Sequence, residues 1–116
     1  MSFCGIFITA HPAIQGVQQM RMNWGESLAV SGDRAMALIR TDRDTWCDTN
    51  FNNTKDAADA TGPFVVAAAV NTGQGRVVAV ADNAFQDDGL QSNMPVLRAF
   101  LRWTTRYRTD LLCARP

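Results

Sequence analysis

Apolar runs separated by glycine-, proline- and asparagine-rich connections indicate short strands along most of this 116-residue chain. Residues 3–9 are rich in aromatic and β-branched side chains, which favour an extended strand. The pair His11-Pro12 ends this strand, because proline disfavours helical conformations in the residue before it. Residues 35–41 predict another strand. Weaker patterns predict a turn at residues 13–17 and short extended segments at residues 20–24 and 27–31.

The strongest strand signal is a pair of apolar runs in the second half of the chain. Residues 64–70 and 76–81 are dominated by valine and alanine, and residues 71–75 between them include Gly73 and Gly75. A five-residue connection with two glycines is typical of a β-hairpin. Because both runs are apolar at nearly every position, we expect both faces of this part of the sheet to be covered.

One amphipathic helix is predicted after the hairpin. Asn93 is a favourable cap residue, and Pro95 fits the first helical turn. Apolar residues then recur at helical spacing up to about Tyr107, while arginines recur every four residues on another face. The resulting fold class is α/β: a small mixed sheet with a late β-hairpin and a C-terminal helix packed on it, in a single domain over residues 1–116.

A long polar loop over residues 42–61 holds the first group of candidate binding residues. Loops of this length in compact domains are usually functional. Its aromatic residues, Trp46 and Phe51, either pin the loop to the domain or line a ligand pocket. Asp48 and Asn50 are the polar residues that would share such a pocket.

A second polar loop follows the hairpin, at the end of a strand, where α/β sheets place ligand sites. Its candidate residues are Asp82, Asn83, Asp87 and Asp88. Carboxylate and amide oxygens suit Mg²⁺ or Ca²⁺, but the spacing in this loop matches no calcium loop. Capping of the loop or of the following helix explains the same residues. We therefore expect a candidate ligand surface here, with no metal and no cofactor.

The charge balance and the cysteine content argue against nucleic-acid binding, membrane binding and a zinc site. Eleven basic and eleven acidic residues give a formal net charge of +0, so no general attraction to nucleic acid or to an anionic membrane is expected. The arginines of the last helix are interpreted as a solvated face, with a phosphate- or nucleic-acid-binding patch as the alternative. Three widely spaced cysteines without a CxxC pair, beside a single histidine, do not complete a zinc set and predict reduced thiols in a cytoplasmic protein. The apolar N-terminal run is too short to span a membrane.

Several segments taken in order resemble a known family. They are residues 11–17 (His-Pro-Ala-Ile-Gln-Gly-Val), 45–49 (Thr-Trp-Cys-Asp-Thr), 62–69 (Gly-Pro-Phe-Val-Val-Ala-Ala-Ala), 75–82 (Gly-Arg-Val-Val-Ala-Val-Ala-Asp) and the helix from Asn93 to Trp103. The set is similar to the C-terminal half of class I glutamine-amidotransferase-like domains, of the non-catalytic gliding-motility and intraflagellar-transport type and related bacterial domains. The resemblance implies a flavodoxin-like fold.

One departure from that family changes the expected assembly. Full-length members carry several βα units before the His-Pro segment, whereas only residues 3–9 precede it in this sequence. The resemblance therefore implies a half-domain. A half sheet exposes an apolar edge and face, so we expect a second copy of the chain to complete the core, as a homo-oligomer.

The functional expectation is a non-catalytic ligand-binding or protein-assembly module, whose partner is a protein or a small polar ligand. The alternative is a small cysteine-dependent hydrolase or amidotransferase remnant that uses Cys4 with His11. Cys4 lacks the preceding glycine of a nucleophile elbow, and Asp82-Asn83 stands where the family's His-x-Glu pair is expected. If it is not catalytic, His11 is a loop residue that hydrogen-bonds the backbone. We also include it among the candidate ligand-binding residues.

Overall fold

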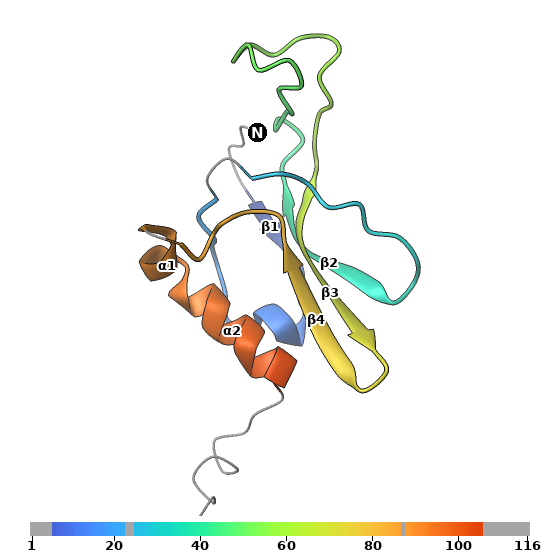
Figure 1. The fold of residues 1–116 in the computed structure, drawn as a ribbon, viewed down its shortest axis with the longest axis vertical. Helices are drawn as coiled ribbons and strands as arrows, with labels where there is room; N and C mark the ends of the chain where they lie inside the picture. The colour runs from blue at the N-terminus through green and yellow to red at the C-terminus, as the bar shows by residue number, and fades with distance from the viewer. Residues whose placement is uncertain (1–5, 23–24, 87, 106–116) are drawn as a thin grey trace, which may run out of the picture.

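A computed structural model describes residues 6–22, 25–86 and 88–105 (Figure 1). The elements are β1 (Ile6–Ile8), the 3-10 turn η1 (Pro12–Ile14), β2 (Ala35–Thr41), β3 (Val65–Thr72), β4 (Gly75–Val80), α1 (Asp88–Ser92) and α2 (Met94–Thr105). The strands form one sheet in the order β1-β2-β3-β4. This arrangement confirms the α/β class, the late hairpin and the C-terminal helix packed on the sheet. Every pairing between these four strands is antiparallel, which corrects the predicted mixed sheet: no parallel pair of the flavodoxin-like kind occurs among the described strands.

The hairpin between β3 and β4 is tighter than the five-residue connection that we predicted. Thr72 pairs with Gly75, which leaves Gly73 and Gln74 as a two-residue turn. Gly73 has φ of 59°, a conformation that glycine adopts without steric cost. A two-residue turn with glycine first matches the right-handed twist of the flanking strands, so the two valine- and alanine-rich strands are held in register.

The pairing of β2 with β3 contains two facing irregularities. Ala37 pairs with Ala68 and Ile39 with Ala67, so Leu38 is an extra residue on β2; the next pair, Arg40 with Val65, leaves Val66 extra on β3. Each is a β-bulge, which locally increases strand twist. Leu38 and Val66 are both fully buried, so the bulges place two large side chains in the core.

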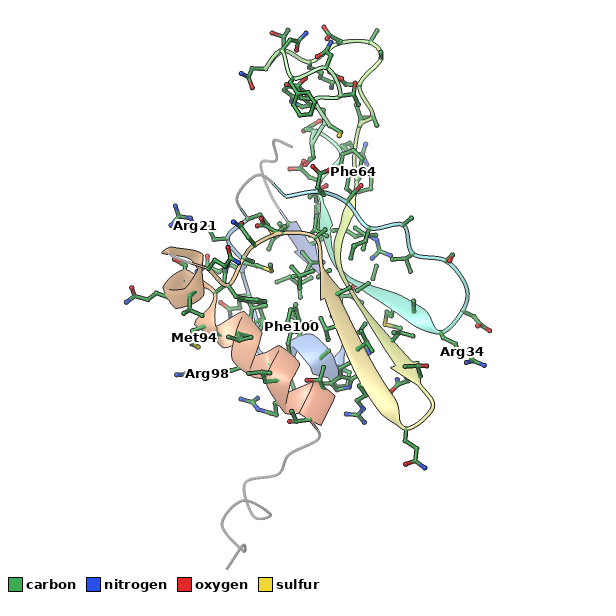
Figure 2. The ribbon with its side chains drawn as sticks, in the orientation of Figure 1. Arg21, Arg34, Phe64, Met94, Arg98 and Phe100 are labelled. Carbon is green, nitrogen blue, oxygen red and sulfur yellow. The ribbon has the colours of Figure 1, made fainter. Side chains whose placement is uncertain are left out.

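One face of the sheet carries the hydrophobic core. Cross-strand neighbours on this face include Ile8, Ile39, Ala67 and Val80, and they pack with the buried side of α2. The buried α2 residues are Val96, Ala99, Phe100 and Trp103. Figure 2 shows Phe100 on the side of α2 that faces the sheet. Of the described helices, none is long and apolar enough to cross a membrane.

The opposite face of the sheet is buried at Ala37 on β2 but is uncovered by this chain along β1 and β4, so its covering by a second copy stays a prediction. Burial along β4 alternates strictly, and Val77 is 48% exposed. Phe7 on β1 is 64% exposed. Valine and alanine also occupy the outward positions of β4. The strand is therefore apolar on both sides, although a helix of this chain covers only one of them.

Three connecting segments differ from the predictions. Residues 20–22 and 27–31 form no strand, and Leu28 contributes only a single bridge to Val65. Residues 23–24 lie outside the described ranges. A short helix, α1, occupies part of the region that we predicted as loop. It leads directly into α2 because the Asn93 N–H donates to the Gly89 carbonyl at 2.8 Å, and this tertiary setting overrides weak local propensity.

Asn93 precedes α2 as predicted, but its side chain does not cap that helix. Its Oδ1 accepts from the Arg21 N–H at 2.7 Å, and its Nδ2 donates to the carbonyls of Arg21 and Ala84 at 2.8 Å each. The residue is 1% exposed. Asn93 therefore joins the N-terminal segment, the loop after β4 and the start of α2 through one buried amide.

Candidate functional site

The candidate residues lie at two opposite ends of the sheet. Trp46 and Asp48 belong to the loop between β2 and β3, and Asp82 and Asn83 follow β4 at that same end, where the Ala81 N–H donates to the Val66 carbonyl. His11 packs at the hairpin end. Asp87 lies outside the described residues. Asp88 begins α1, and its side chain also lies outside them. Among the candidate residues that are described, His11 is thus not brought together with Asp48 or Asp82.

His11 has a defined structural role. Its Nδ1 accepts a hydrogen bond from the Ala13 N–H at 3.0 Å, which caps η1. Its ring meets the Trp103 ring edge-on, with centroids 5.2 Å apart. On the same indole, the Arg76 guanidinium carbon lies 5.0 Å from the ring centroid, and Arg76 Nη1 donates to the Trp103 carbonyl at 2.9 Å. His11 is thus one part of a packed cluster at the end of α2.

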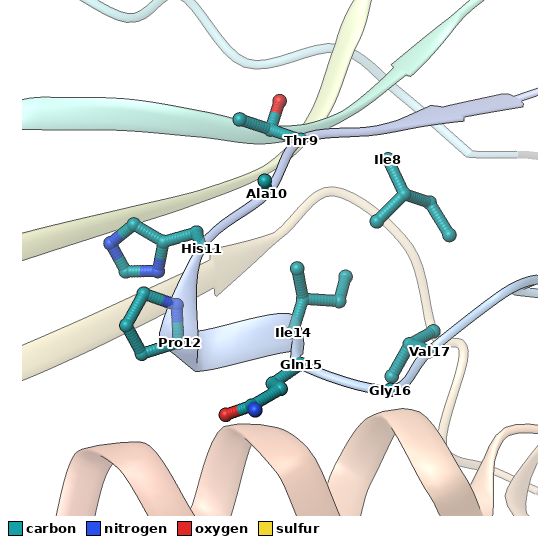
Figure 3. Close-up of a pocket in the computed structure, with 9 residues that line it drawn as sticks. All are labelled: Ile8, Thr9, Ala10, His11, Pro12, Ile14, Gln15, Gly16 and Val17. Atoms are coloured by element: carbon teal, nitrogen blue, oxygen red, sulfur yellow. The ribbon is translucent and has the colours of Figure 1, made fainter.

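Burial, and then the positive charge of Arg76, lower the pKa of His11 below its ordinary value of 6.5. The imidazole is therefore mainly neutral at pH 7, with its proton on Nε2 because Nδ1 is the acceptor. Figure 3 shows the hollow beside this residue, about 570 Å³ in volume and lined by residues 8–12 and 14–17. Cys4, the partner of His11 in the hydrolase hypothesis, lies outside the described residues, so that pairing stays a prediction.

The loop over residues 42–61, named the projecting loop below, begins as a continuation of the sheet. Trp46 forms a bridge with Thr61, and the Cys47 N–H donates to the Ala60 carbonyl at 2.8 Å. Its two arms approach closely at Gly62, where a β-carbon would overlap the carbonyl oxygen of Asp42. Figure 1 shows the loop extending beyond the sheet, away from α1 and α2.

The outer part of the projecting loop is organised by side-chain oxygens that accept hydrogen bonds from its own backbone and amides. The Asp48 carboxylate accepts from the Asn52 N–H at 3.2 Å and from the Asn53 N–H at 2.7 Å. One oxygen of Asp56 accepts from the side-chain amides of Asn50 and Asn52, both at 2.8 Å. These contacts order a segment with few apolar anchors.

Asp59 is the buried member of this network and is 7% exposed. Its carboxylate accepts from the Asp56 N–H at 2.8 Å, and from the N–H and hydroxyl of Thr49 at 3.1 and 3.0 Å. The backbone hydrogen bonds from Asp56 and Thr49 lower the pKa of Asp59 below its ordinary value, although burial opposes them. Asp59 therefore carries a negative charge that fixes the two arms of the loop.

Phe51 stands at the tip of this network. Its side chain is 89% exposed, the largest exposure among the large hydrophobic residues described. Its φ of 59° lies in the left-handed region, which is uncommon for a bulky residue. Trp46, by contrast, is half-buried near the base of the loop. The two aromatics therefore do not share one environment: Trp46 anchors the loop, and Phe51 is presented to solvent.

A spacing that the sequence reasoning missed runs through the same loop. Counting Asp48 as position 1, polar side chains occupy positions 1, 3, 5, 9 and 12 of a twelve-residue segment; they are Asp48, Asn50, Asn52, Asp56 and Asp59. EF-hand calcium loops place their ligands at these positions, with a glycine at position 6. Asn53 occupies position 6 with φ of 60°. Among the described residues, no three histidine, cysteine or carboxylate side chains are gathered as metal ligands.

The acidic loop after β4 shows local contacts. The Asp82 carboxylate accepts from the N–H of the next residue, Asn83, at 2.8 Å. Asp82 is half-buried and Asn83 exposed. Comparison with known proteins adds no assignment to either loop: no family model, no curated protein and no solved structure matches this chain.

Proposed function

We propose that the protein is a non-catalytic binding module that associates with a second copy of itself, and that the projecting loop is its recognition element. The observation that carries the proposal is the position of Phe51, an aromatic side chain 89% exposed at the tip of a loop. Aromatic residues that enter a partner's pocket commonly dominate the binding energy of protein interfaces. From the spacing of the cysteines we place the module in the cytoplasm.

The hydrogen bonds of the loop support this role. Asp48 and Asp59 hold backbone N–H groups on both arms, so the loop does not have to become ordered when it binds. A surface that is already ordered loses less conformational entropy on association. The Phe51 side chain is therefore carried by a loop whose backbone is already ordered.

We expect the Phe51→Ser variant to raise the dissociation constant of self-association by about tenfold or more, because a buried aromatic contact is lost. Sedimentation velocity over a series of concentrations measures this constant. The matched control is Phe7→Ser, which removes another exposed phenylalanine, 64% exposed, from the open sheet face. The control should keep the wild-type constant, and at concentrations where the wild type is monomeric both variants should keep its unfolding midpoint, because association itself raises the midpoint.

Two results would overturn the loop-mediated version. The first is a wild-type protein that stays monomeric at every concentration. The second is a dimer broken by Phe7→Ser and unaffected by Phe51→Ser, which would move the interface to the open face of the sheet.

A second candidate function is favoured by the twelve-residue spacing: the projecting loop binds a hard divalent cation. The side-chain amides of Asn50 and Asn52 both donate to one oxygen of Asp56. These two donors occupy the oxygen that a bound cation would contact. The side-chain oxygens of Asn50 and Asn52 accept from the N–H groups of Asn52 and Thr54, so a cation would have to displace these hydrogen bonds to gain the oxygen ligands that Ca²⁺ prefers. Aspartate at position 12 is shorter than the usual glutamate, so weaker binding than in an EF-hand is expected.

The cation hypothesis predicts that CaCl₂ raises the unfolding midpoint above its value in NaCl of equal ionic strength, because a cation that binds only the folded state stabilises it. Asp48→Asn should remove the shift. Asp44→Asn is the matched control, since Asp44 is exposed in the same loop but precedes the twelve-residue segment, and it should keep the shift. Equal midpoints in CaCl₂, MgCl₂ and NaCl would reject cation binding and leave the self-association proposal intact.

A further inference from the structure

A second hollow lies on the other side of the molecule from the projecting loop, between the segment after η1 and the helix α2. Its volume is about 220 Å³. One wall is Gln15, Gly16 and Val17; the other is α2, with Arg98 and Arg102. Figure 3 shows Gln15 turned toward α2. Buried Ala13 and Ile14 lie beside this wall in η1 and fix it to the core.

The two arginines give this hollow its charge. Arg98 and Arg102 are both exposed and stand one helical turn apart, where side chains are neighbours. Within the described ranges, neither guanidinium is paired with a carboxylate. Figure 2 shows Arg98 on the side of α2 away from the sheet. Two like charges at this spacing repel each other, so an anion between them is favourable.

We propose that this hollow binds the phosphate group of a small soluble metabolite. The guanidinium groups of Arg98 and Arg102 are planar forks that donate paired hydrogen bonds to phosphate oxygens. Gln15 adds an uncharged amide on the opposite wall. The volume is below the roughly 300–1,000 Å³ of pockets that enclose drug-sized ligands. The hollow therefore fits an anionic group, with the remainder of the ligand in solvent.

The test is a titration of the protein with inorganic phosphate, followed by NMR at the Gly16 amide and the arginine side chains, with NaCl of equal ionic strength as reference. We expect saturable shifts at these groups. Arg98→Gln and Arg102→Gln should each weaken phosphate binding about tenfold or more, because a charge-assisted hydrogen bond is lost. Arg34→Gln is the matched control: Arg34 is an exposed arginine before β2, far from the hollow, and should bind phosphate like the wild type.

Each other outcome overturns the proposal. Shifts that do not saturate, or that NaCl reproduces, mean that the arginines are only a solvated helix face. An equal loss in Arg34→Gln means a non-specific charge effect. If the protein pellets with phosphatidic acid vesicles but does not respond to soluble phosphate, the ligand is a lipid headgroup and not a soluble metabolite. Because Phe51 and Asp48 are not involved, these results are independent of the function proposed for the projecting loop.

Discussion

The Asn93→Ala variant is expected to lose about 3 kcal/mol or more of unfolding free energy, because removal of the amide leaves one buried and two partly buried backbone groups without partners, at about 1–3 kcal/mol each. Those groups are the N–H and carbonyl of Arg21 and the carbonyl of Ala84. The loss is large because Asn93 is 1% exposed and water cannot readily replace the amide. Urea denaturation followed by circular dichroism measures it.

Two further variants separate the hydrogen bonds of Asn93 from helix propensity. Gln91→Ala changes an exposed residue of α1 and should stay within about 0.5 kcal/mol of wild type. Asn93→Asp keeps an acceptor for Arg21 but turns an oxygen toward two carbonyls, so it should be as destabilised as the alanine variant. A cost below about 1 kcal/mol for Asn93→Ala would show that the amide is not the link between these segments.

The second large effect is expected at Trp103. Trp103→Ala should lower the unfolding free energy by about 3–5 kcal/mol, the usual cost of deleting a buried large aromatic side chain. The indole is 7% exposed and also contacts the His11 ring and the Arg76 guanidinium. Its removal therefore loosens both the cap of η1 and the start of β4. Thermal and chemical denaturation with matched baselines measure the loss.

Leu101→Ala is the control for Trp103, two residues earlier on the same helix. Leu101 is 52% exposed, so its truncation should change stability by about 0.5 kcal/mol or less. Similar losses in the two variants would contradict the orientation of α2 described above and would indicate that the helix packs through its other face.

The elements were predictable where local chemistry and tertiary packing agree. Residues 35–41 were predicted as a strand and form β2 with the same bounds; the helix predicted after Asn93 is α2, and its predicted last residue, Tyr107, lies outside the described residues. The hairpin was predictable because Gly73 supplies the positive φ of its turn. The exposed face was expected only from the half-domain resemblance, because valine and alanine at outward positions of β4 carry no signal for which side is covered.

The candidate site was only partly predictable, for a different reason. Asp48 and Trp46 were correctly placed in a long polar loop, but which aromatic reaches solvent depends on hydrogen bonds that the composition of the loop does not specify. The predicted capping role of Asn93 failed similarly, because its partner Arg21 is 72 residues away in the chain. The twelve-residue spacing from Asp48 to Asp59 was visible in the sequence itself and needed only to be counted from the right position.

The facing bulges of β2 and β3 have a consequence for how the strands find each other. Residues 67–69 of β3 are all alanine. By themselves they would allow β3 to pair with β2 after a shift of two residues, because such a shift keeps the same faces of the strands together. Leu38 and Val66 remove that freedom, because any slide would take two large, fully buried side chains out of their positions in the core. Each strand thus has one extra residue, so the two strands stay equal in length. Burial of these two residues selects a single register for strands whose alanines alone would allow several.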